Sequence, residues 1–117
     1  MNDLVERIFV FSTDVIKFLR TVPNNVETNV LKYQLIKSAT SVGANYEEAQ
    51  AGISRREFKA KVSIALKEAR EANYWIRIFV EIGLSKEKEI NRLLKESEEL
   101  KSILGSIVSK MHKTINQ

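Results

Sequence analysis

The chain has 117 residues, of which 44% are hydrophobic, and a formal net charge of +4. This length suits one compact domain over residues 1–117, and the single proline and four glycines favour long helices over a sheet with many turns. The absence of cysteine excludes disulfides and thiolate metal sites. No apolar run fits a signal peptide or spans a bilayer. We therefore expect a cytoplasmic, all-α protein that contacts no membrane.

The first predicted helix starts near Leu4 and ends before Pro23, because proline disfavours helical geometry at the residue before it. Its apolar seam advances in alternating steps of four and three residues, as in a bundle helix: Leu4, Ile8, Phe11, Val15, Phe18 and Val22. A second apolar row lies beside the seam: Val5, Phe9, Ile16 and Leu19. This wide face predicts contact with two neighbouring helices or with a neighbouring subunit.

The second predicted helix begins near Glu27 or Thr28 and is ended by Gly52. Two positions of its seam are polar: the seam comprises Leu31, Leu35, Ser38, Val42, Asn45 and Ala49. A parallel row is rich in small residues: Ile36, Ala39, Gly43 and Tyr46. Gly43 destabilises a helix interior by about 1 kcal/mol relative to alanine. We expect the close approach of a neighbouring helix to offset this loss.

Ser54 and Glu57 fit a capping box that starts a third helix, which ends before Gly83. Its seam is regular: Phe58, Val62, Ala65, Ala69, Ala72, Ile76 and Phe79. Ser85 is the expected N-cap of a fourth helix. The seam of that helix comprises Ile90, Leu93, Leu100, Leu104, Ile107 and Met111. Because the connections are short, sequence neighbours must run antiparallel, which predicts an up-down-up-down four-helix bundle.

Several short segments carry a resemblance to a known family: residues 34–46, 48–49, 54–58, 64–69, 71, 74–75 and 98–100. Together they resemble the 23S rRNA intervening sequence proteins, which are four-helix bundle proteins found in bacteria and often have no assigned role. That family is similar in fold and oligomeric habit to the accessory protein of diversity-generating retroelements, a basic pentamer that partners a reverse transcriptase and nucleic acid. The resemblance therefore implies a homopentamer.

The third helix carries cations that are candidates for binding nucleic-acid phosphates through charge and counterion release. They are Arg55, Arg56, Lys59, Lys61, Lys67, Arg70 and Arg77. Repetition of this set around an oligomer would strengthen a weak site by avidity. The alternative is a solvated surface in which glutamates offset the cations, as in the pair of Glu57 and Lys61. No base-reading motif decides between the two.

Polar residues also interrupt the apolar rows of the second and third helices. Glu71, for example, lies one heptad from both Ile64 and Ile78. A hairpin that turns near Ile53 sets the carboxylates of the third helix opposite small polar residues of the second. We predict a structural polar seam that fixes helix register or subunit packing, rather than a catalytic pair. Its members are Ser38, Ser41, Asn45, Glu68 and Glu71.

No set of catalytic residues or metal ligands stands out. Di-iron bundles need Glu-x-x-His motifs, and the one histidine, His112, belongs to none; we expect it to face the helix dipole or solvent. Tyr46, Tyr74 and Trp75 are candidates for a platform on which bases stack. Tyr46 and Trp75 share helical faces with small or apolar residues, however, so we expect both to pack between helices with their polar tips at the surface. We predict no catalytic residue, no metal, no cofactor and no enzyme.

Two functions fit these expectations. The first is a non-enzymatic, homo-oligomeric helical bundle that binds RNA or a ribonucleoprotein through basic surface residues. The alternative is an oligomeric scaffold or adaptor for a protein partner, without direct nucleic-acid contact. Only the first predicts an affinity for RNA that falls steeply as the salt concentration rises.

Overall fold

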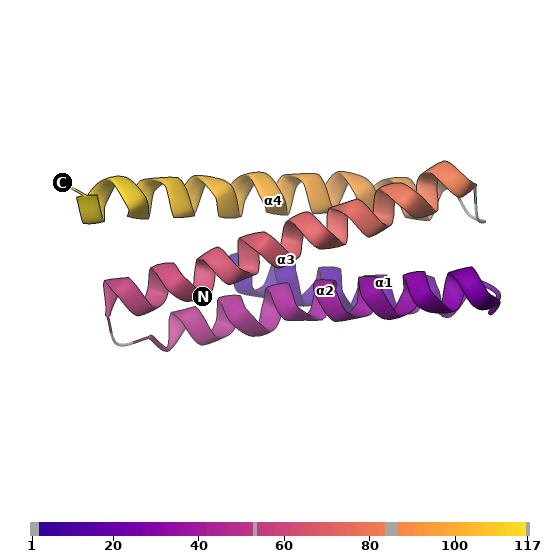
Figure 1. Ribbon diagram of the computed structural model, residues 1–117, viewed down its shortest axis with the longest axis horizontal. Helices are drawn as coiled ribbons and strands as arrows, with labels where there is room; N and C mark the ends of the chain where they lie inside the picture. Colours follow the sequence, from indigo (N-terminus) through magenta and orange to yellow (C-terminus); the bar gives the residue numbers. More distant parts are fainter. Residues whose placement is uncertain (1–2, 53, 84–86, 117) are drawn as a thin grey trace.

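Four antiparallel helices form the molecule, as a computed structural model shows for residues 3–52, 54–83 and 87–116. In chain order they are α1 (Asp3–Leu19), α2 (Val26–Gln50), α3 (Arg55–Ile82) and α4 (Glu87–Asn116), and the described residues contain no strand (Figure 1). α2 packs between α1 and α3, and α4 packs against α3 and α1. The bundle measures 49 × 25 × 21 Å. The predicted all-α, up-down-up-down four-helix bundle is confirmed.

A capping box that the sequence analysis missed starts α2. The backbone N–H of Thr28 donates to the Asn25 side chain, and the N–H of Asn25 donates to the Thr28 hydroxyl, both over 2.9 Å. α2 therefore begins at Val26, slightly before the predicted start. The box was overlooked because threonine takes the place of the usual glutamate or glutamine at its third helical position.

The other helix ends agree with prediction in part. The Ser54 hydroxyl accepts from the N–H of Glu57 at 3.0 Å, as expected for the cap of α3. Gly83 ends α3 in the left-handed conformation, with φ of 69°. Gly52 does not act in this way: α2 ends at Gln50, and the next residue, in right-handed geometry, forms its cap. The predicted cap Ser85 lies outside the described residues.

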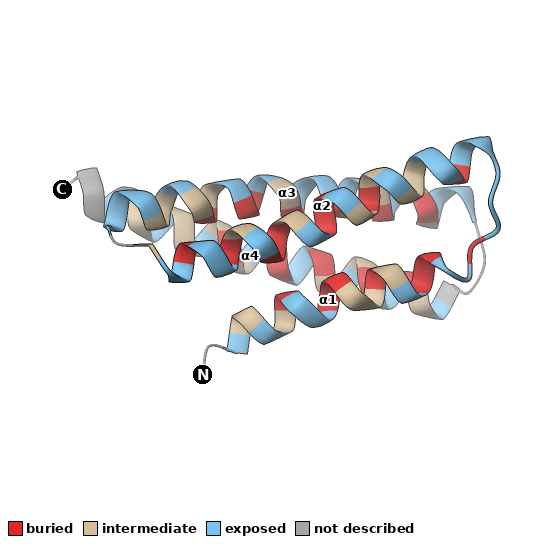
Figure 2. Ribbon diagram, turned by 90° about the horizontal axis from the view of Figure 1, so that it is seen from below, coloured by how far each residue is buried: buried red, intermediate tan, exposed pale blue. Residues whose placement is uncertain are grey.

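The predicted seams form one continuous core, and the buried residues of each helix face the centre of the bundle (Figure 2). Each helix contributes its seam positions, with Phe18 of α1 packed edge to face against Phe79 of α3. The second row of α1 is only partly buried: Leu19 belongs to the core and Val5 packs against it, whereas Phe9 remains 55% exposed. Trp75 packs against the core as predicted, but its Nε1 atom is buried without a hydrogen-bond partner and does not reach the surface.

Gly43 lies where α1 comes close to α2. A Cβ atom at this position would stand 3.3 Å from Cγ2 of Ile8 and 3.7 Å from Oγ of Ser12. The Ser12 hydroxyl also donates to the backbone carbonyl of Ala39 on α2 at 3.0 Å. The close approach predicted from the small residues of α2 is therefore present between α1 and α2.

Substitutions at two helical glycines should have opposite effects on stability. Gly43→Leu places a large side chain against Ile8, forces α1 away from α2, and should lower the free energy of unfolding by about 1–3 kcal/mol. Gly105→Ala is the control, because a Cβ atom there would approach only Leu66, at 4.0 Å. It should raise the free energy of unfolding by about 0.5–1 kcal/mol through helix propensity. Urea unfolding followed by circular dichroism measures both, and unchanged stability in Gly43→Leu would contradict the close approach.

Candidate nucleic-acid interface

The cations predicted as one set on α3 divide between two sides of the helix. At 100° per residue, all but one fall within an arc of about 120° on the outer face: Arg55, Arg56, Lys59, Lys67, Arg70 and Arg77. Lys61 lies on the side toward α2, where its Nζ atom pairs with the Glu48 carboxylate at 3.2 Å. The structure therefore keeps six of the predicted residues together and separates Lys61 from them.

A buried polar pair between α3 and α4 anchors part of this face. Asn73 and Ser97 are each only 2% exposed. The side-chain amide of Asn73 donates to the Ser97 hydroxyl at 3.0 Å, and that hydroxyl donates to the backbone carbonyl of Leu94 at 2.8 Å. The pair satisfies polar groups that would otherwise be buried without partners, and it fixes how α3 and α4 align.

Two cations converge on the same asparagine from the outside. The Arg77 Nε and the Lys101 Nζ both donate to Oδ1 of Asn73, at 3.2 and 3.4 Å. Lys101 thereby joins the cations of α3, although it comes from α4. We call the six outer cations of α3 together with Lys101 the basic face.

Asn73, Ser97 and Lys101 were not among the site residues predicted from the sequence. A signal for the first two was present, because each lies one heptad from two apolar residues. Asn73 stands between Leu66 and Val80, and Ser97 between Ile90 and Leu104. The same comparison of positions one heptad apart identified Glu71 as a polar residue within an apolar row. Lys101 carried no such signal, because its place depends on the alignment of two helices.

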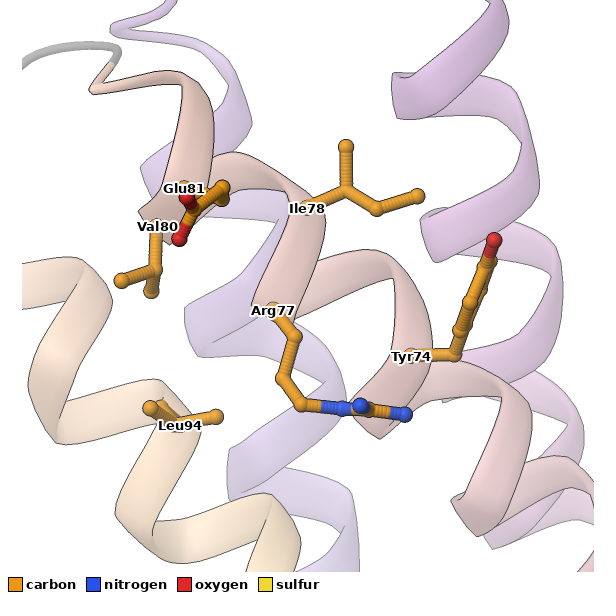
Figure 3. A pocket seen from close by; sticks show the side chains of 6 residues that line it. All are labelled: Tyr74, Arg77, Ile78, Val80, Glu81 and Leu94. Atoms are coloured by element: carbon orange, nitrogen blue, oxygen red, sulfur yellow. The ribbon is translucent and has the colours of Figure 1, made fainter.

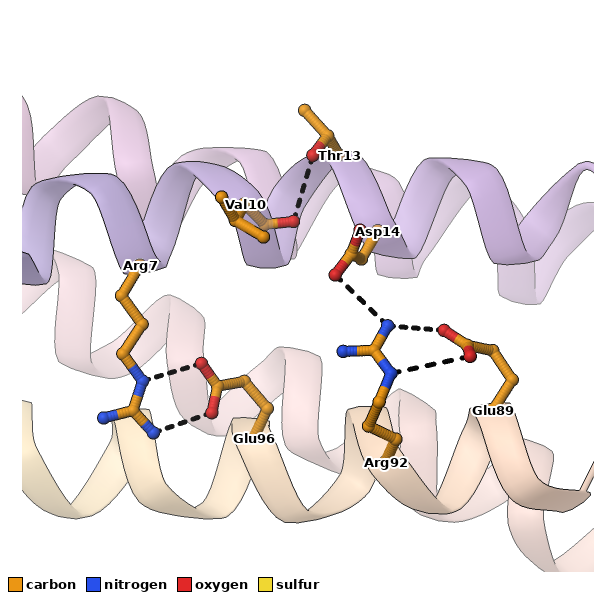
Figure 4. Close-up of polar contacts among 7 residues, drawn as sticks. All are labelled: Arg7, Val10, Thr13, Asp14, Glu89, Arg92 and Glu96. Atoms are coloured by element: carbon orange, nitrogen blue, oxygen red, sulfur yellow. Dashed lines mark hydrogen bonds and ion pairs between the residues drawn. The ribbon is translucent and has the colours of Figure 1, made fainter.

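Within the part of the chain that the structure describes, the basic face differs from the charged surface between α1 and α4 in its lack of ion pairs. Among the described residues, no carboxylate lies within 4.0 Å of the charged nitrogens of Arg70, Arg77 or Lys101. Between α1 and α4, in contrast, Arg7 holds Glu96 through two bonds of 2.7 Å, and Arg92 bridges Asp14 and Glu89 (Figure 4). The cations of the basic face thus remain available to an external anion.

The ion pairs of Arg7 also explain its titration. Hydrogen bonds from the guanidinium to Glu96 and Glu99 raise the pKa of Arg7 above its usual range. Arg92 behaves in the same way, with its pKa raised first by the hydrogen bond to Glu89. Both arginines therefore stay charged and paired, and they hold α1 against α4.

An open groove lies at the end of the basic face. Its volume is about 380 Å³, and it is lined by Tyr74, Arg77, Ile78, Val80, Glu81 and Leu94 (Figure 3). Tyr74 is 49% exposed, whereas Tyr46 is buried. The Arg77 guanidinium carbon stands 5.6 Å from the centre of the Tyr74 ring, within range of a cation–π contact. Of the aromatic residues considered for stacking, Tyr74 is thus the one that reaches this groove.

The members of the predicted polar seam are only partly brought together. Ser38, Glu68 and Glu71 line a polar pocket of about 210 Å³ between α2 and α3. Ser41 and Asn45 lie outside it, with the Asn45 amide donating to the Ser41 carbonyl within α2 at 2.9 Å. Glu71 is exposed, so its stripe belongs to the outer surface of α3 and not to the core. Whether these residues set the helix register stays a prediction.

Glu68 is the carboxylate of this pocket with a perturbed environment. Burial raises its pKa, and a hydrogen bond with Glu71 raises it further. Lys67 on the same helix and Lys37 on α2 act in the opposite direction but do not cancel the effect. The Glu68 carboxyl group is therefore protonated more readily in the folded protein than in the unfolded chain.

The described residues offer no set of three or more metal-ligating side chains of the histidine, cysteine, aspartate or glutamate type. His112 is exposed, and its Nδ1 atom lies 3.1 Å from Nζ of Lys59. In the same part of the chain, none of the helices is both long and apolar enough to cross a membrane.

The fold and this surface define an antiparallel four-helix bundle with a basic face. The sequence matches the family described as 23S rRNA-intervening sequence protein over residues 2–106, and the chain belongs to that family. It is similar to a crystal structure of a protein with unknown function from the S23 ribosomal protein family of Bacteroides thetaiotaomicron VPI-5482. The two share 28% identity with a TM-score of 0.81, over 90% of this chain and 97% of the other. No curated protein matches.

The titration of Glu68 gives a test of the polar pocket. Because its folded pKa is raised, its stabilising contribution is full below the unfolded value near 4.5 and is lost as the pH rises through the folded pKa. Glu68→Gln removes the like-charge repulsion, and at pH 7 it should raise the free energy of unfolding by about 0.2–0.5 kcal/mol. The difference from the parent should shrink toward pH 4.

Urea unfolding between pH 4 and pH 8 measures this effect. Glu98→Gln is the matched control, because Glu98 is exposed and does not line the pocket. A Glu68→Gln variant that is less stable than the parent at pH 7 would show instead that Lys37 and Lys67 depend on the charge of Glu68.

Proposed function

We propose that this protein is a non-enzymatic, homo-oligomeric helical bundle of the bacterial cytoplasm that binds RNA or a ribonucleoprotein through its basic face. The observation that carries the proposal is the group of unpaired cations around Asn73, where Arg77 and Lys101 are held together across two helices. The description of the family, which refers to intervening sequences of 23S rRNA, supports a nucleic-acid partner.

The extent of the basic face suits a polyanion. Arg56 and Arg77 are separated along α3 by about 30 Å, at 1.5 Å per residue. A nucleic-acid strand that follows the helix passes several cations, and each neutralised phosphate releases condensed counterions. Arginine adds geometric fit, because its planar guanidinium donates two parallel hydrogen bonds to one phosphate.

An apolar groove between α1 and α2 supports self-association. Its volume is about 390 Å³, and its walls come from Phe9, Ser12, Thr13, Ile16, Thr40, Gly43, Ala44 and Glu47. The exposed ring of Phe9 and the small side chains of α2 offer a second copy both an anchor and a place for close approach. A pentamer, as the family resemblance implies, would repeat the basic face around its ring and increase avidity.

A second candidate function is supported by the outer surface of α2. Val26 is 87% exposed and Val30 and Tyr33 are more than half exposed, so three large apolar side chains line one side of this helix. Residues at these spacings form a single stripe on a helix. Such a stripe suits a protein partner, in which case the oligomer is a scaffold or adaptor that makes no direct contact with nucleic acid.

Charge reversal on the basic face should abolish most RNA binding. The variant Arg70→Glu, Arg77→Glu, Lys101→Glu removes three phosphate contacts, which should flatten the slope of log affinity against log salt by about 2 for a single strand. Fluorescence anisotropy with a labelled 20-nucleotide RNA between 50 and 200 mM salt measures it. The control Lys17→Glu, Arg20→Glu, Lys95→Glu changes the net charge equally at exposed sites elsewhere. Equal loss in both variants would show that net charge alone is responsible.

Light scattering on a sizing column tests the oligomer. The parent should elute with a mass of five times 13.4 kDa, and Phe9→Asp should shift it to smaller species because a charge would be buried at the interface. Val26→Asp is the control, since Val26 lies on the other apolar surface. A parent protein that stays monomeric at every concentration would refute the assembly. If Val26→Asp dissociates the oligomer and Phe9→Asp does not, the interface lies on the outer surface of α2 instead.

A further inference from the structure

The groove beside the basic face has features that phosphate binding does not require. Three of its lining side chains are aliphatic, Ile78, Val80 and Leu94, and the exposed ring of Tyr74 stands beside them. A surface that served only to attract phosphates would gain nothing from this apolar lining. The groove therefore suits a ligand with a flat apolar body close to a negative charge.

We propose that the groove receives one unpaired base of the bound RNA, while the adjoining phosphate contacts Arg77 and Lys101. This inference rests on the proposed function and adds that the RNA is single-stranded at this position. Charge complementarity selects the occupant, because Arg77 lines the groove and, with Lys101, has no carboxylate partner within 4.0 Å among the described residues. A base follows its phosphate into the adjacent apolar space only when it is not paired in a duplex.

Tyr74 provides the aromatic surface. Its ring packs edge to face against Trp75 at a centroid distance of 5.0 Å and lies under the Arg77 guanidinium. Both contacts hold the ring in place before a ligand arrives, so little side-chain freedom is lost on binding. Stacking of a base on such an aromatic or guanidinium surface is a principal source of affinity for single strands.

Glu81 gives the groove a preference among bases. It lies one heptad beyond Tyr74, about 10 Å along the helix, with the Ile78 and Arg77 side chains between the two (Figure 3). A base that contacts the Tyr74 ring can extend across them toward the Glu81 carboxylate. An ionised carboxylate accepts hydrogen bonds and donates none. It therefore favours a base with an exocyclic amino group, such as cytosine or adenine, over uracil, whose exocyclic groups only accept.

Three RNAs of equal length test the inference by anisotropy at fixed salt: a cytosine homopolymer, a uracil homopolymer and a blunt duplex. The parent should bind the cytosine strand more tightly than either of the others. Tyr74→Leu should weaken binding of the cytosine strand by about 5- to 150-fold and leave the duplex unchanged, because only the unpaired base uses the ring. Tyr74→Phe should bind like the parent. Glu81→Gln should reduce the preference for cytosine over uracil, since an amide can both donate and accept.

The outcomes separate this inference from the proposed function. If single strands and the duplex bind equally and Tyr74→Leu changes neither, the groove is not a base site, although salt-dependent RNA binding stands. If no RNA binds even at 50 mM salt, both fail, and the groove and the outer surface of α2 become candidates for a protein partner. Thermal unfolding of Tyr74→Leu confirms that a loss of binding does not reflect a loss of fold, and Glu81→Gln provides a second readout.

Discussion

Alanine occupies three consecutive seam positions of α3, at Ala65, Ala69 and Ala72, and none of these side chains is more than 4% exposed. With only a methyl group at each position, α2 and α4 can lie close to the backbone of α3 on both sides. Close packing leaves few alternative rotations of α3, because turning the helix would replace a methyl group with a long charged side chain. The orientation of the basic face toward solvent is thus a consequence of the opposite, alanine-lined side of the same helix.

The pair of Asn73 and Ser97 adds to this packing a constraint along the helix axis. Apolar contacts tolerate small shifts between α3 and α4. A buried amide that loses its hydrogen-bond partner, in contrast, destabilises the folded protein by about 1–3 kcal/mol. The hydrogen bond between the two side chains therefore selects one alignment. The same amide oxygen accepts from Arg77 and Lys101, so the interaction that aligns the helices also sets the spacing of the two surface cations.

The features that could be predicted from the sequence are those set by the spacing of residues within a single helix. The four seams and the end of α3 at Gly83 follow from local spacing, and they are correct. The same rotation of 100° per residue would also have separated Lys61 from the other cations, had it been applied to charged as well as apolar residues. Lys101 and the groove beside Tyr74 were out of reach for a different reason: they combine residues of α3 and α4, and their meeting depends on an alignment that no single-helix pattern contains.

A net charge of only +4 is compatible with a strongly basic face because the carboxylates are distributed unevenly. On α4, Glu89, Glu96 and Glu99 are engaged by arginines at the contact with α1. Each of these arginines neutralises only one of its two carboxylates, so each cluster keeps a single net negative charge, and its field is screened beyond a Debye length, about 8 Å in physiological salt. The field at the outer face of α3 is then set by the nearby cations, which have no carboxylate partner among the described residues. An anion at α3 therefore responds to the local arrangement of charges, which places Glu89, Glu96 and Glu99 beside arginines near α1, and the total charge of the chain is a poor guide to it.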